Sequence, residues 1–114
     1  MQGGIEWLVD AYGCAPDRLR DRAVVIALLD RIVRDLELHV VATSVHVFGG
    51  AGGVTALYLL AESHLAIHTF PETGVVTLNA YSCAPRRATD WRALCEDAFA
   101  ARDVTVRELP RGAT

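Results

Sequence analysis

Apolar and polar residues alternate or mix at short range over six stretches of this chain, and two other stretches repeat apolar residues with a helical period. Short alternating stretches bounded by glycine, proline and polar turns predict strands at residues 4–11, 38–48, 54–61, 64–70, 74–81 and 104–109. The longer helical stretch is predicted to run from Asp17, as its N-cap, to about Glu37. A second helix is predicted from about Asp90 to Arg102.

The order of these elements, β-α-β-β-β-β-α-β, indicates the fold class. Consecutive strands joined by short turns pair antiparallel, and the helices then cover one face of the sheet. We therefore expect an α+β protein, a two-layer α/β sandwich with a mainly antiparallel sheet. The other face of the sheet needs cover, and a second copy of the chain is the simplest supplier. The expected assembly is a homodimer with an αββα sandwich.

Composition narrows the possible functions. The chain has 114 residues, of which 52% are hydrophobic, and it is expected to form one domain over residues 1–114. Its formal charge of −3 makes nucleic acid an unexpected partner, and the lengths of its apolar runs make a membrane equally unexpected. Three cysteines without a CxxC pair favour reduced thiols and a cytoplasmic location. Residues 110–114 are predicted to be a loose tail.

The densest chemistry lies in residues 62–72, where two carboxylates, two imidazoles and a serine interrupt an otherwise apolar strand. Polar groups in such a segment cost free energy unless they are paired or functional. Strand geometry places Glu62, His64, Ala66 and His68 on one face and the intervening residues on the other. Taken alone, a serine here is most often a turn residue and a histidine most often a core residue. An imidazole is nevertheless the side chain that changes charge near neutral pH without special tuning.

Three further segments carry the same family resemblance as residues 62–72: Gly53-Val54-Thr55, Leu59-Leu60-Ala61 and Tyr81-Ser82-Cys83. Residues 8–14 carry it more weakly. Together these segments resemble the prokaryotic S-adenosylmethionine decarboxylase proenzyme family, whose members are pyruvoyl-dependent. The resemblance implies that the Ser63 hydroxyl attacks the Glu62 carbonyl and that the resulting ester eliminates and hydrolyses to a pyruvoyl group at position 63. The chain would become two, residues 1–62 and 63–114. The product of decarboxylation would be the aminopropyl donor for spermidine synthesis.

The same resemblance implies roles for particular side chains. His68 would assist the elimination step, the Thr55 hydroxyl would support processing, and the Cys83 thiol would protonate the substrate after carbon dioxide leaves. Substrate contacts would come from two rings that sandwich the adenine, a carboxylate at the ribose and the carboxylate at the cleavage site: Phe48, Phe70, Glu72 and Glu62. The covalent pyruvoyl group, derived from Ser63, is the expected cofactor, because its amide carbonyl accepts the electrons released with carbon dioxide. No metal is expected. Cys14 and Cys95 are interpreted as structural.

Several positions depart from the residues usual in that family. The departures are Thr55 for serine, Phe70 for tryptophan, Asn79 for aspartate, Tyr81 for phenylalanine and Ala84 for glycine. The residues of the cleavage step are all retained. We therefore expect the departures to bear on the choice of substrate more than on the chemistry.

Three alternatives remain open from the sequence. The same pyruvoyl machinery could accept arginine or ornithine, since Asn79 and Tyr81 leave room for another substrate. The chain could instead be a non-catalytic paralogue that regulates an active partner, although such proteins usually lose the serine or the acid. A metal site of His64, His68 and Cys83, with His46, is the third alternative, without a paired-ligand spacing to support it.

Overall fold

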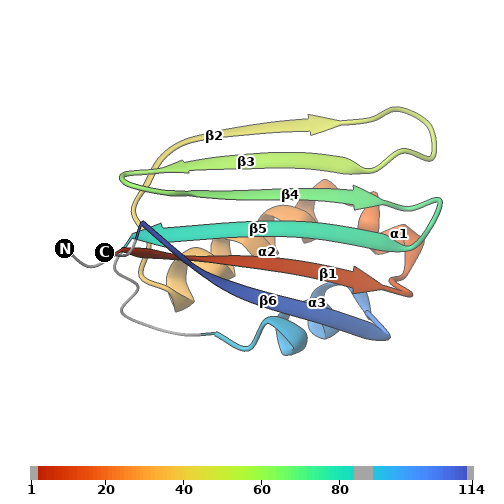
Figure 1. Cartoon of the computed structure of the whole chain (residues 1–114). Coiled ribbons are helices and arrows are strands. Elements are labelled where there is room, and N and C mark those ends of the chain that lie inside the picture. Colours follow the sequence, from red (N-terminus) through yellow and green to blue (C-terminus); the bar gives the residue numbers. More distant parts are fainter. Residues whose placement is uncertain (1–2, 84–88, 113–114) are drawn as a thin grey trace.

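The fold is a six-stranded antiparallel sheet with helices on one of its faces, as predicted (Figure 1). The computed structural model describes residues 3–83 and 89–112. Ala84, one of the departures noted above, lies outside these residues. The elements in chain order are β1 Gly4–Tyr12, α1 Pro16–Leu19, α2 Arg22–Asp35, β2 Val40–Val47, β3 Val54–Leu60, β4 His64–Phe70, β5 Val75–Cys83, α3 Trp91–Phe99 and β6 Asp103–Arg111.

The sheet order is β2-β3-β4-β5-β1-β6, and each neighbouring pair is antiparallel. Strands β2 to β5 follow one another as a meander, whereas β1 pairs with β5 and then carries β6 on its other side. In this register His64 lies opposite both Leu59 and Tyr81, and His68 lies opposite both Thr55 and Thr77. The register therefore decides which predicted site residues become neighbours.

The core forms between the helices and one face of the sheet. In β4, Leu65, Ile67 and Thr69 are buried, while His64, Ala66, His68 and Phe70 point to the other face and are partly or largely exposed. This confirms the alternation predicted for the strand. The buried face of α2 supplies four fully packed side chains to the same core: Val25, Leu28, Leu29 and Ile32. Each such aliphatic side chain stabilises the fold by about 1.5–3 kcal/mol through burial.

The prediction of one helix from Asp17 to about Glu37 is wrong. The chain forms the short α1 and then breaks before α2, because Asp21 is extended, with φ −93° and ψ 107°. Its carboxylate accepts a hydrogen bond of 2.9 Å from the Ala23 N–H, so Asp21 and not Asp17 is the N-cap. Asp17 instead pairs with Arg20. The apolar period that predicted the helix begins at Val25, so it did not locate the N-terminus of the helix.

The C-terminal elements also differ from the prediction. Helix α3 ends at Phe99 and not at Arg102, because Ala100 takes the left-handed conformation with φ 56°. Strand β6 continues to Arg111, so residues 110 and 111 are paired with β1 and are not a loose tail. Among the described residues, no helix combines the length and the apolar character that crossing a membrane requires.

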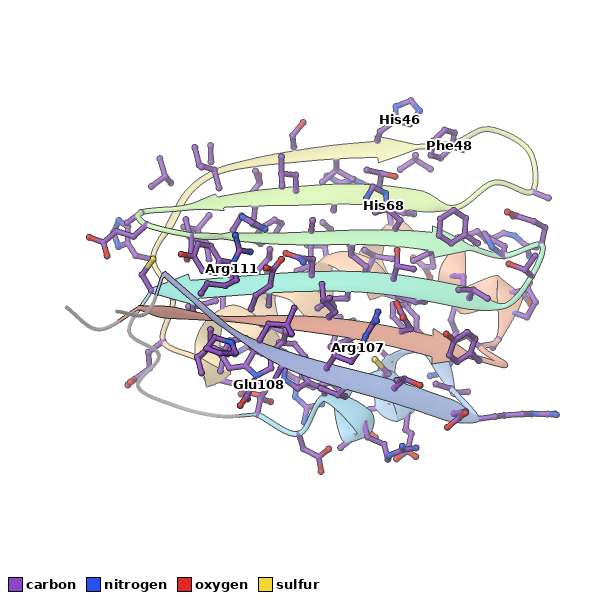
Figure 2. The ribbon with its side chains drawn as sticks, viewed as in Figure 1. His46, Phe48, His68, Arg107, Glu108 and Arg111 are labelled. Carbon is purple, nitrogen blue, oxygen red and sulfur yellow. The ribbon has the colours of Figure 1, made fainter. Side chains whose placement is uncertain are left out.

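The sheet face away from the helices, here called the open face, carries a mixture of polar groups and exposed apolar side chains. Its apolar members include Leu57 and Leu59 on β3 and Phe70 on β4, with exposed fractions of 48%, 52% and 39%. Figure 2 shows His68, Arg107 and Arg111 distributed over this face of the sheet. The candidate chemistry lies on and beside the open face.

Thr69 joins the helical layer to the sheet. Its hydroxyl accepts a hydrogen bond of 2.8 Å from the Val54 N–H and donates one of 2.6 Å to the Leu19 carbonyl. The approach is close, since a Cβ on Gly53 would lie 2.0 Å from the Thr69 carbonyl oxygen. This contact fixes the start of β3 against the end of β4 and α1.

We predict that Thr69→Val lowers the free energy of unfolding by about 2 kcal/mol, because it leaves a buried N–H and a buried carbonyl without partners. Urea unfolding followed by circular dichroism measures the change. Thr69→Ser keeps the hydroxyl and serves as the control, with a loss well below that of the valine variant. Equal losses in the two variants would contradict the role given to the hydroxyl.

Candidate active site

A tight hairpin between β3 and β4 presents the Glu62–Ser63 peptide bond. Its two-residue loop, Ala61 and Glu62, is closed by a 3.0 Å hydrogen bond from the Leu60 N–H to the Ser63 carbonyl. The Ala61 N–H donates to the His39 carbonyl, also at 3.0 Å, so the segment before β2 supports the loop. Ala61 and Glu62 are exposed and Ser63 is half-buried. The peptide bond is therefore both accessible and firmly placed.

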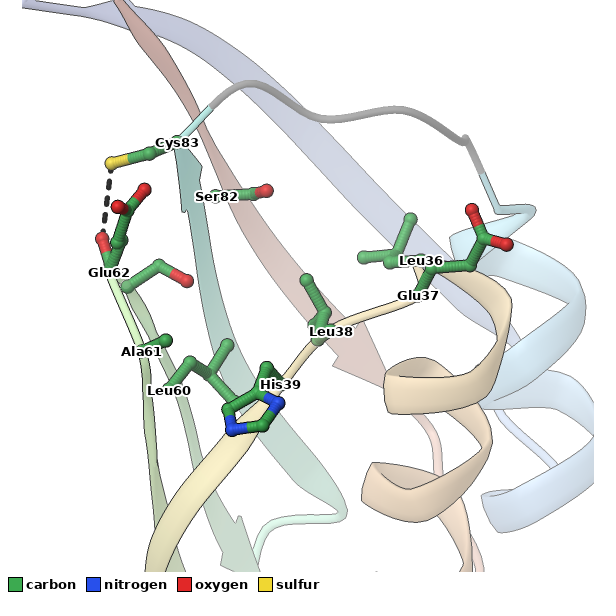
Figure 3. A pocket seen from close by; sticks show the side chains of 10 residues that line it. Leu36, Glu37, Leu38, His39, Leu60, Ala61, Glu62, Ser82 and Cys83 are labelled. Atoms are coloured by element: carbon green, nitrogen blue, oxygen red, sulfur yellow. Dashed lines mark hydrogen bonds between the residues drawn. The ribbon is translucent and has the colours of Figure 1, made fainter.

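Cys83, the last residue of β5, lies at this peptide bond. Its thiol donates a hydrogen bond of 3.1 Å to the Glu62 carbonyl oxygen (Figure 3). A donor on this oxygen draws electrons from the carbonyl carbon and makes it easier for a nucleophile to attack. The structure thus brings together three residues that the sequence predicted: Glu62, Ser63 and Cys83.

A cavity of about 380 Å³ opens on the hairpin from the side of α2. Ser63, Ser82 and Cys83 line it together with His39 from the segment that precedes β2 (Figure 3). Ser82 is buried, so its hydroxyl belongs to the helical side of the sheet. No role was predicted for His39, because the alternation that places it in a predicted strand carries no signal for the hairpin it touches.

The three cysteines differ in their surroundings. Cys14 and Cys95 are buried in the core, whereas Cys83 is half-buried at the cavity. Burial raises the pKa of the Cys14 thiol, and burial, with nearby Cys14 and Glu96, raises the pKa of Cys95 to about 12. Both thiols stay protonated at neutral pH, which agrees with their structural interpretation.

A series of linked polar side-chain contacts crosses the open face beside the hairpin. The His64 ring nitrogen Nε2 lies 2.7 Å from Asn79 Oδ1, and Asn79 Nδ2 donates to Glu6 Oε2 at 2.6 Å. The other Glu6 oxygen pairs with Arg111, whose guanidinium lies 5.7 Å from the centre of the Tyr81 ring. The hydrogen bond from Asn79, followed by the contacts with Arg111, lowers the pKa of Glu6 against the effect of its burial. Glu6 and Arg111 were missed by the sequence analysis.

Tyr81 connects this chain of contacts to Cys83. Its ring lies 5.8 Å from that of His64, and its interaction with the neighbouring Cys83 raises the pKa of the Tyr81 phenol. Asn79 and Tyr81 are two of the departures from the usual family residues, and both lie next to the hairpin. These two departures therefore lie beside His64, the first residue of β4 after the hairpin.

A second cluster lies toward the opposite ends of β3 and β4. Thr55 Oγ1 and His68 Nδ1 are 3.0 Å apart, so the two residues to which the resemblance gives separate roles in processing are neighbours. Near them, the His46 and Phe48 rings meet edge to face with centres 4.5 Å apart. Phe48 and Phe70 are exposed by 52% and 39%. Figure 2 shows His46, Phe48 and His68 near one another on this part of the sheet.

The two clusters are separated within one chain. Ser63 and His68 are five residues apart along an extended strand, which corresponds to roughly 17 Å. His68 therefore does not reach Ser63 in the protomer described. Glu72 lies in the turn after β4, where it lines a separate hollow with Arg102. Within one chain, the predicted residues therefore lie in two clusters, one at the hairpin and one around His68, with Glu72 in a separate hollow.

The residues named for a metal site do not form one. His46 and His68 belong to the second cluster, while His64 and Cys83 belong to the hairpin region. Within residues 3–83 and 89–112, no three histidine, cysteine or acidic side chains gather in a way that could hold a metal ion.

Comparison with known proteins identifies the family. The family model described as S-adenosylmethionine decarboxylase matches residues 5–112, which is nearly the whole chain. The chain belongs to this family.

Relatives in the family carry the name S-adenosylmethionine decarboxylase proenzyme. The protein from Pyrobaculum islandicum is 34% identical over 84 residues, covering 70% of this chain and 67% of that protein. The protein from Clostridium botulinum strain Hall is 29% identical over 113 residues, covering 96% and 94%. The crystal structure of the adenosylmethionine decarboxylase from Aquifex aeolicus superposes with a TM-score of 0.81 at 24% identity, over 99% of this chain and 93% of that one. The fold of this family member is thereby established, as predicted.

We predict that iodoacetamide at pH 7.5 alkylates Cys83 in the native protein and leaves Cys14 and Cys95 unmodified. The reason is that the buried thiols are shielded and their pKa values are raised, whereas Cys83 is accessible. Peptide mapping by mass spectrometry identifies the alkylated residue, and Cys83→Ala is the control. Alkylation of either buried cysteine at a comparable rate would contradict the burial described here.

Proposed function

We propose that this chain is a pyruvoyl-dependent S-adenosylmethionine decarboxylase, made as a proenzyme that cleaves itself between Glu62 and Ser63. One observation carries the proposal. The carbonyl that the Ser63 hydroxyl would attack already accepts a hydrogen bond from the Cys83 thiol. Membership of the family and the proenzyme names of its relatives support the same activity. The product would be the aminopropyl donor used in spermidine synthesis.

The cleavage step uses groups at the hairpin. The Ser63 oxygen bonds to the Glu62 carbonyl carbon while the peptide C–N bond breaks, so an ester replaces the amide and the nitrogen gains a proton. Cys83 stabilises the negative charge that develops on the Glu62 oxygen during this transfer. Loss of the α-proton of residue 63 then breaks the bond between its Cβ and Oγ, which frees residue 62 with a C-terminal carboxylate and leaves dehydroalanine at position 63. The dehydroalanine takes up a proton on its β-carbon to become an imine, and water replaces the imine nitrogen, which leaves as ammonia. Residues 1–62 and 63–114 become separate chains.

The surroundings of Ser63 fit a pyruvoyl group at this position. The Ser63 carbonyl would remain as the amide carbonyl of that group, and it accepts the 3.0 Å hydrogen bond from the Leu60 N–H. When present, the group supplies a ketone for the substrate amine and an amide carbonyl that takes up the electrons released with carbon dioxide. Leu60 is thus placed to stabilise negative charge on the carbonyl where it accumulates.

Cys83 has a second role in the proposal. After carbon dioxide leaves, the α-carbon of the substrate needs a proton, and the Cys83 thiol is the donor nearest to position 63 among the residues assigned here. We assign the adenine to Phe48 and Phe70, the ribose to Glu72, and a further substrate contact to Glu62.

The distance between the two clusters supports a homodimer. His68 and Thr55 are assigned to processing, yet they lie roughly 17 Å along the strand from Ser63. In a two-fold dimer that joins the open faces, the second cluster of one protomer can lie over the hairpin of the other. The exposed Leu57, Leu59 and Phe70 would then be buried between the sheets. We infer that each complete site combines one protomer's hairpin with the partner's His68.

We predict that Ser63→Ala remains a single 12.4 kDa chain without decarboxylase activity, because the nucleophile and the precursor of the pyruvoyl group are both absent. The wild-type protein should give two fragments with a blocked N-terminus on the second. Intact-mass spectrometry measures the cleavage, and release of labelled carbon dioxide measures activity on S-adenosylmethionine, arginine and ornithine in parallel. Activity in the uncut Ser63→Ala protein would contradict the proposal, and release from arginine or ornithine alone would contradict the substrate.

We predict that His68→Ala slows self-cleavage about 100-fold on its own but is cut at close to the normal rate when paired with Ser63→Ala. In the mixed dimer, the Ser63→Ala protomer supplies an intact His68 to the hairpin of the other chain. Co-expression with two affinity tags isolates the mixed dimer, and the different masses identify which chain is cut.

The matched control for this complementation pairs His68→Ala with the double variant Ser63→Ala/His68→Ala, which supplies no imidazole. The His68→Ala chain should remain slow in that pair. Equal rates with the two partners would show that His68 acts within its own chain.

A further inference from the structure

Four side chains on the open face form a continuous hydrogen-bonded network that the proposed chemistry does not use. The network consists of Arg111, Glu6, Asn79 and His64, from the adjacent strands β6, β1, β5 and β4. The Glu6 side chain is 15% exposed, so most of this carboxylate is removed from water. Figure 2 shows Arg111 reaching over the sheet toward these strands.

The donors and acceptors in the network have one consistent arrangement. An ionised carboxylate only accepts hydrogen bonds, so Asn79 must turn its amide nitrogen to Glu6 and its oxygen to His64. The Asn79 oxygen in turn can only accept, so His64 must carry a proton on Nε2. The contacts with Asn79 and Arg111 lower the pKa of Glu6, which keeps it ionised and the arrangement fixed. In neutral His64, the bare nitrogen is then Nδ1.

His64 has a special position in the proposed mature enzyme. Once the bond before residue 63 is cut, the amide bond to His64 is the one covalent link between the pyruvoyl group and the protein. Whatever fixes His64 therefore fixes the cofactor. The backbone of His64 is held by pairing with Leu59 and Tyr81, and its ring is held by Asn79.

The network also accounts for the missing charge at position 79. The family that this chain resembles usually has aspartate there, and this chain has the neutral Asn79. Glu6 places a carboxylate one strand further away, 2.6 Å from the Asn79 nitrogen. An aspartate at position 79 would face Glu6 at the same distance, and two carboxylates so close cannot both be ionised without a large cost. The residues at positions 6 and 79 are thus coupled.

We infer that Glu6 is a positioning residue for the decarboxylase: acting through Asn79, it sets the tautomer and orientation of His64 and so holds the pyruvoyl group in place. Glu6 thereby carries, from β1, the charge that relatives usually carry at position 79. This inference rests on the proposed function. Glu6 would touch neither the substrate nor the cofactor and would act only through Asn79 and His64.

The test compares Glu6→Gln, Asn79→Asp and the double variant Glu6→Gln/Asn79→Asp. Glu6→Gln should lower kcat per pyruvoyl group about tenfold with KM almost unchanged, since a charge-assisted hydrogen bond is lost behind the cofactor and not at the substrate. Asn79→Asp should lower kcat further, because it opposes two carboxylates. The double variant restores one carboxylate and one amide in exchanged positions, and its kcat should recover to within about threefold of wild type.

Glu108→Gln is the matched control. This variant makes the same change, glutamate to glutamine, on the neighbouring strand β6. Glu108 accepts a hydrogen bond from Trp7 Nε1 and is not part of the network. Its kcat should stay within about twofold of wild type. A Glu6→Gln effect equal to that of Glu108→Gln, or a double variant no better than Asn79→Asp, would overturn the inference.

A spectroscopic measurement separates this inference from the proposed function. In the uncut Ser63→Ala precursor, the ¹⁵N chemical shifts of neutral His64 should show the proton on Nε2, and Glu6→Gln/Asn79→Ala should release this preference. A proton on Nδ1 in the otherwise unaltered precursor would overturn the network whatever the activity. An uncut and inactive wild-type protein would overturn the proposed function, while the His64 spectrum would still test the network.

Discussion

The antiparallel pairing of β4 with two neighbours is the constraint on which the rest of the structure depends. Strand β4 is hydrogen-bonded to β3 on one side and to β5 on the other, so it stays in the sheet even if the peptide bond before residue 63 is broken. The same pairing brings Cys83, at the end of β5, to the Glu62 carbonyl at the start of the hairpin. A scissile bond at the rim of a sheet can therefore be accessible without being loosely held. The proposed cofactor would be rigid for the same reason.

Strand alternation then divides the functions between the two faces. One face is buried against the helices and supplies stability through residues such as Leu65 and Thr69. The open face is left to carry the Thr55–His68 pair and the network that ends at His64. These two groups are separated along the strand, and a two-fold dimer relates such separated groups in a symmetric way. The geometry of the strand thus favours a shared site over one contained in a single chain.

The sequence was a good guide where an interaction is local in the chain and a poor one where it depends on register. Alternation predicted all six strands and the face on which each residue of β4 lies. The short gap between two predicted strands placed Glu62 and Ser63 at a junction, and the structure forms a hairpin there, beside which Cys83 lies. Asp21 replaced Asp17 as the helix N-cap because both are plausible caps and only the backbone distinguishes them. Glu6 and Arg111 could not be predicted, since the contacts of Glu6 with Asn79 and with Arg111 require the order β5-β1-β6, which joins residues 73 and 105 positions apart.

That order changes how the departures from the usual family residues are interpreted. From the sequence, Asn79 and Tyr81 were expected to bear on the choice of substrate. In the structure Asn79 bonds to His64, and Tyr81 lies between Arg111 and Cys83. Neither residue lies in the cluster with Phe48 and His68. Glu6 places a carboxylate 2.6 Å from the Asn79 nitrogen, so this part of the sheet carries a negative charge although residue 79 is neutral. Asn79 and Tyr81 therefore bear on how the start of β4 is supported, whereas the departures at Thr55 and Phe70 lie elsewhere along the strands.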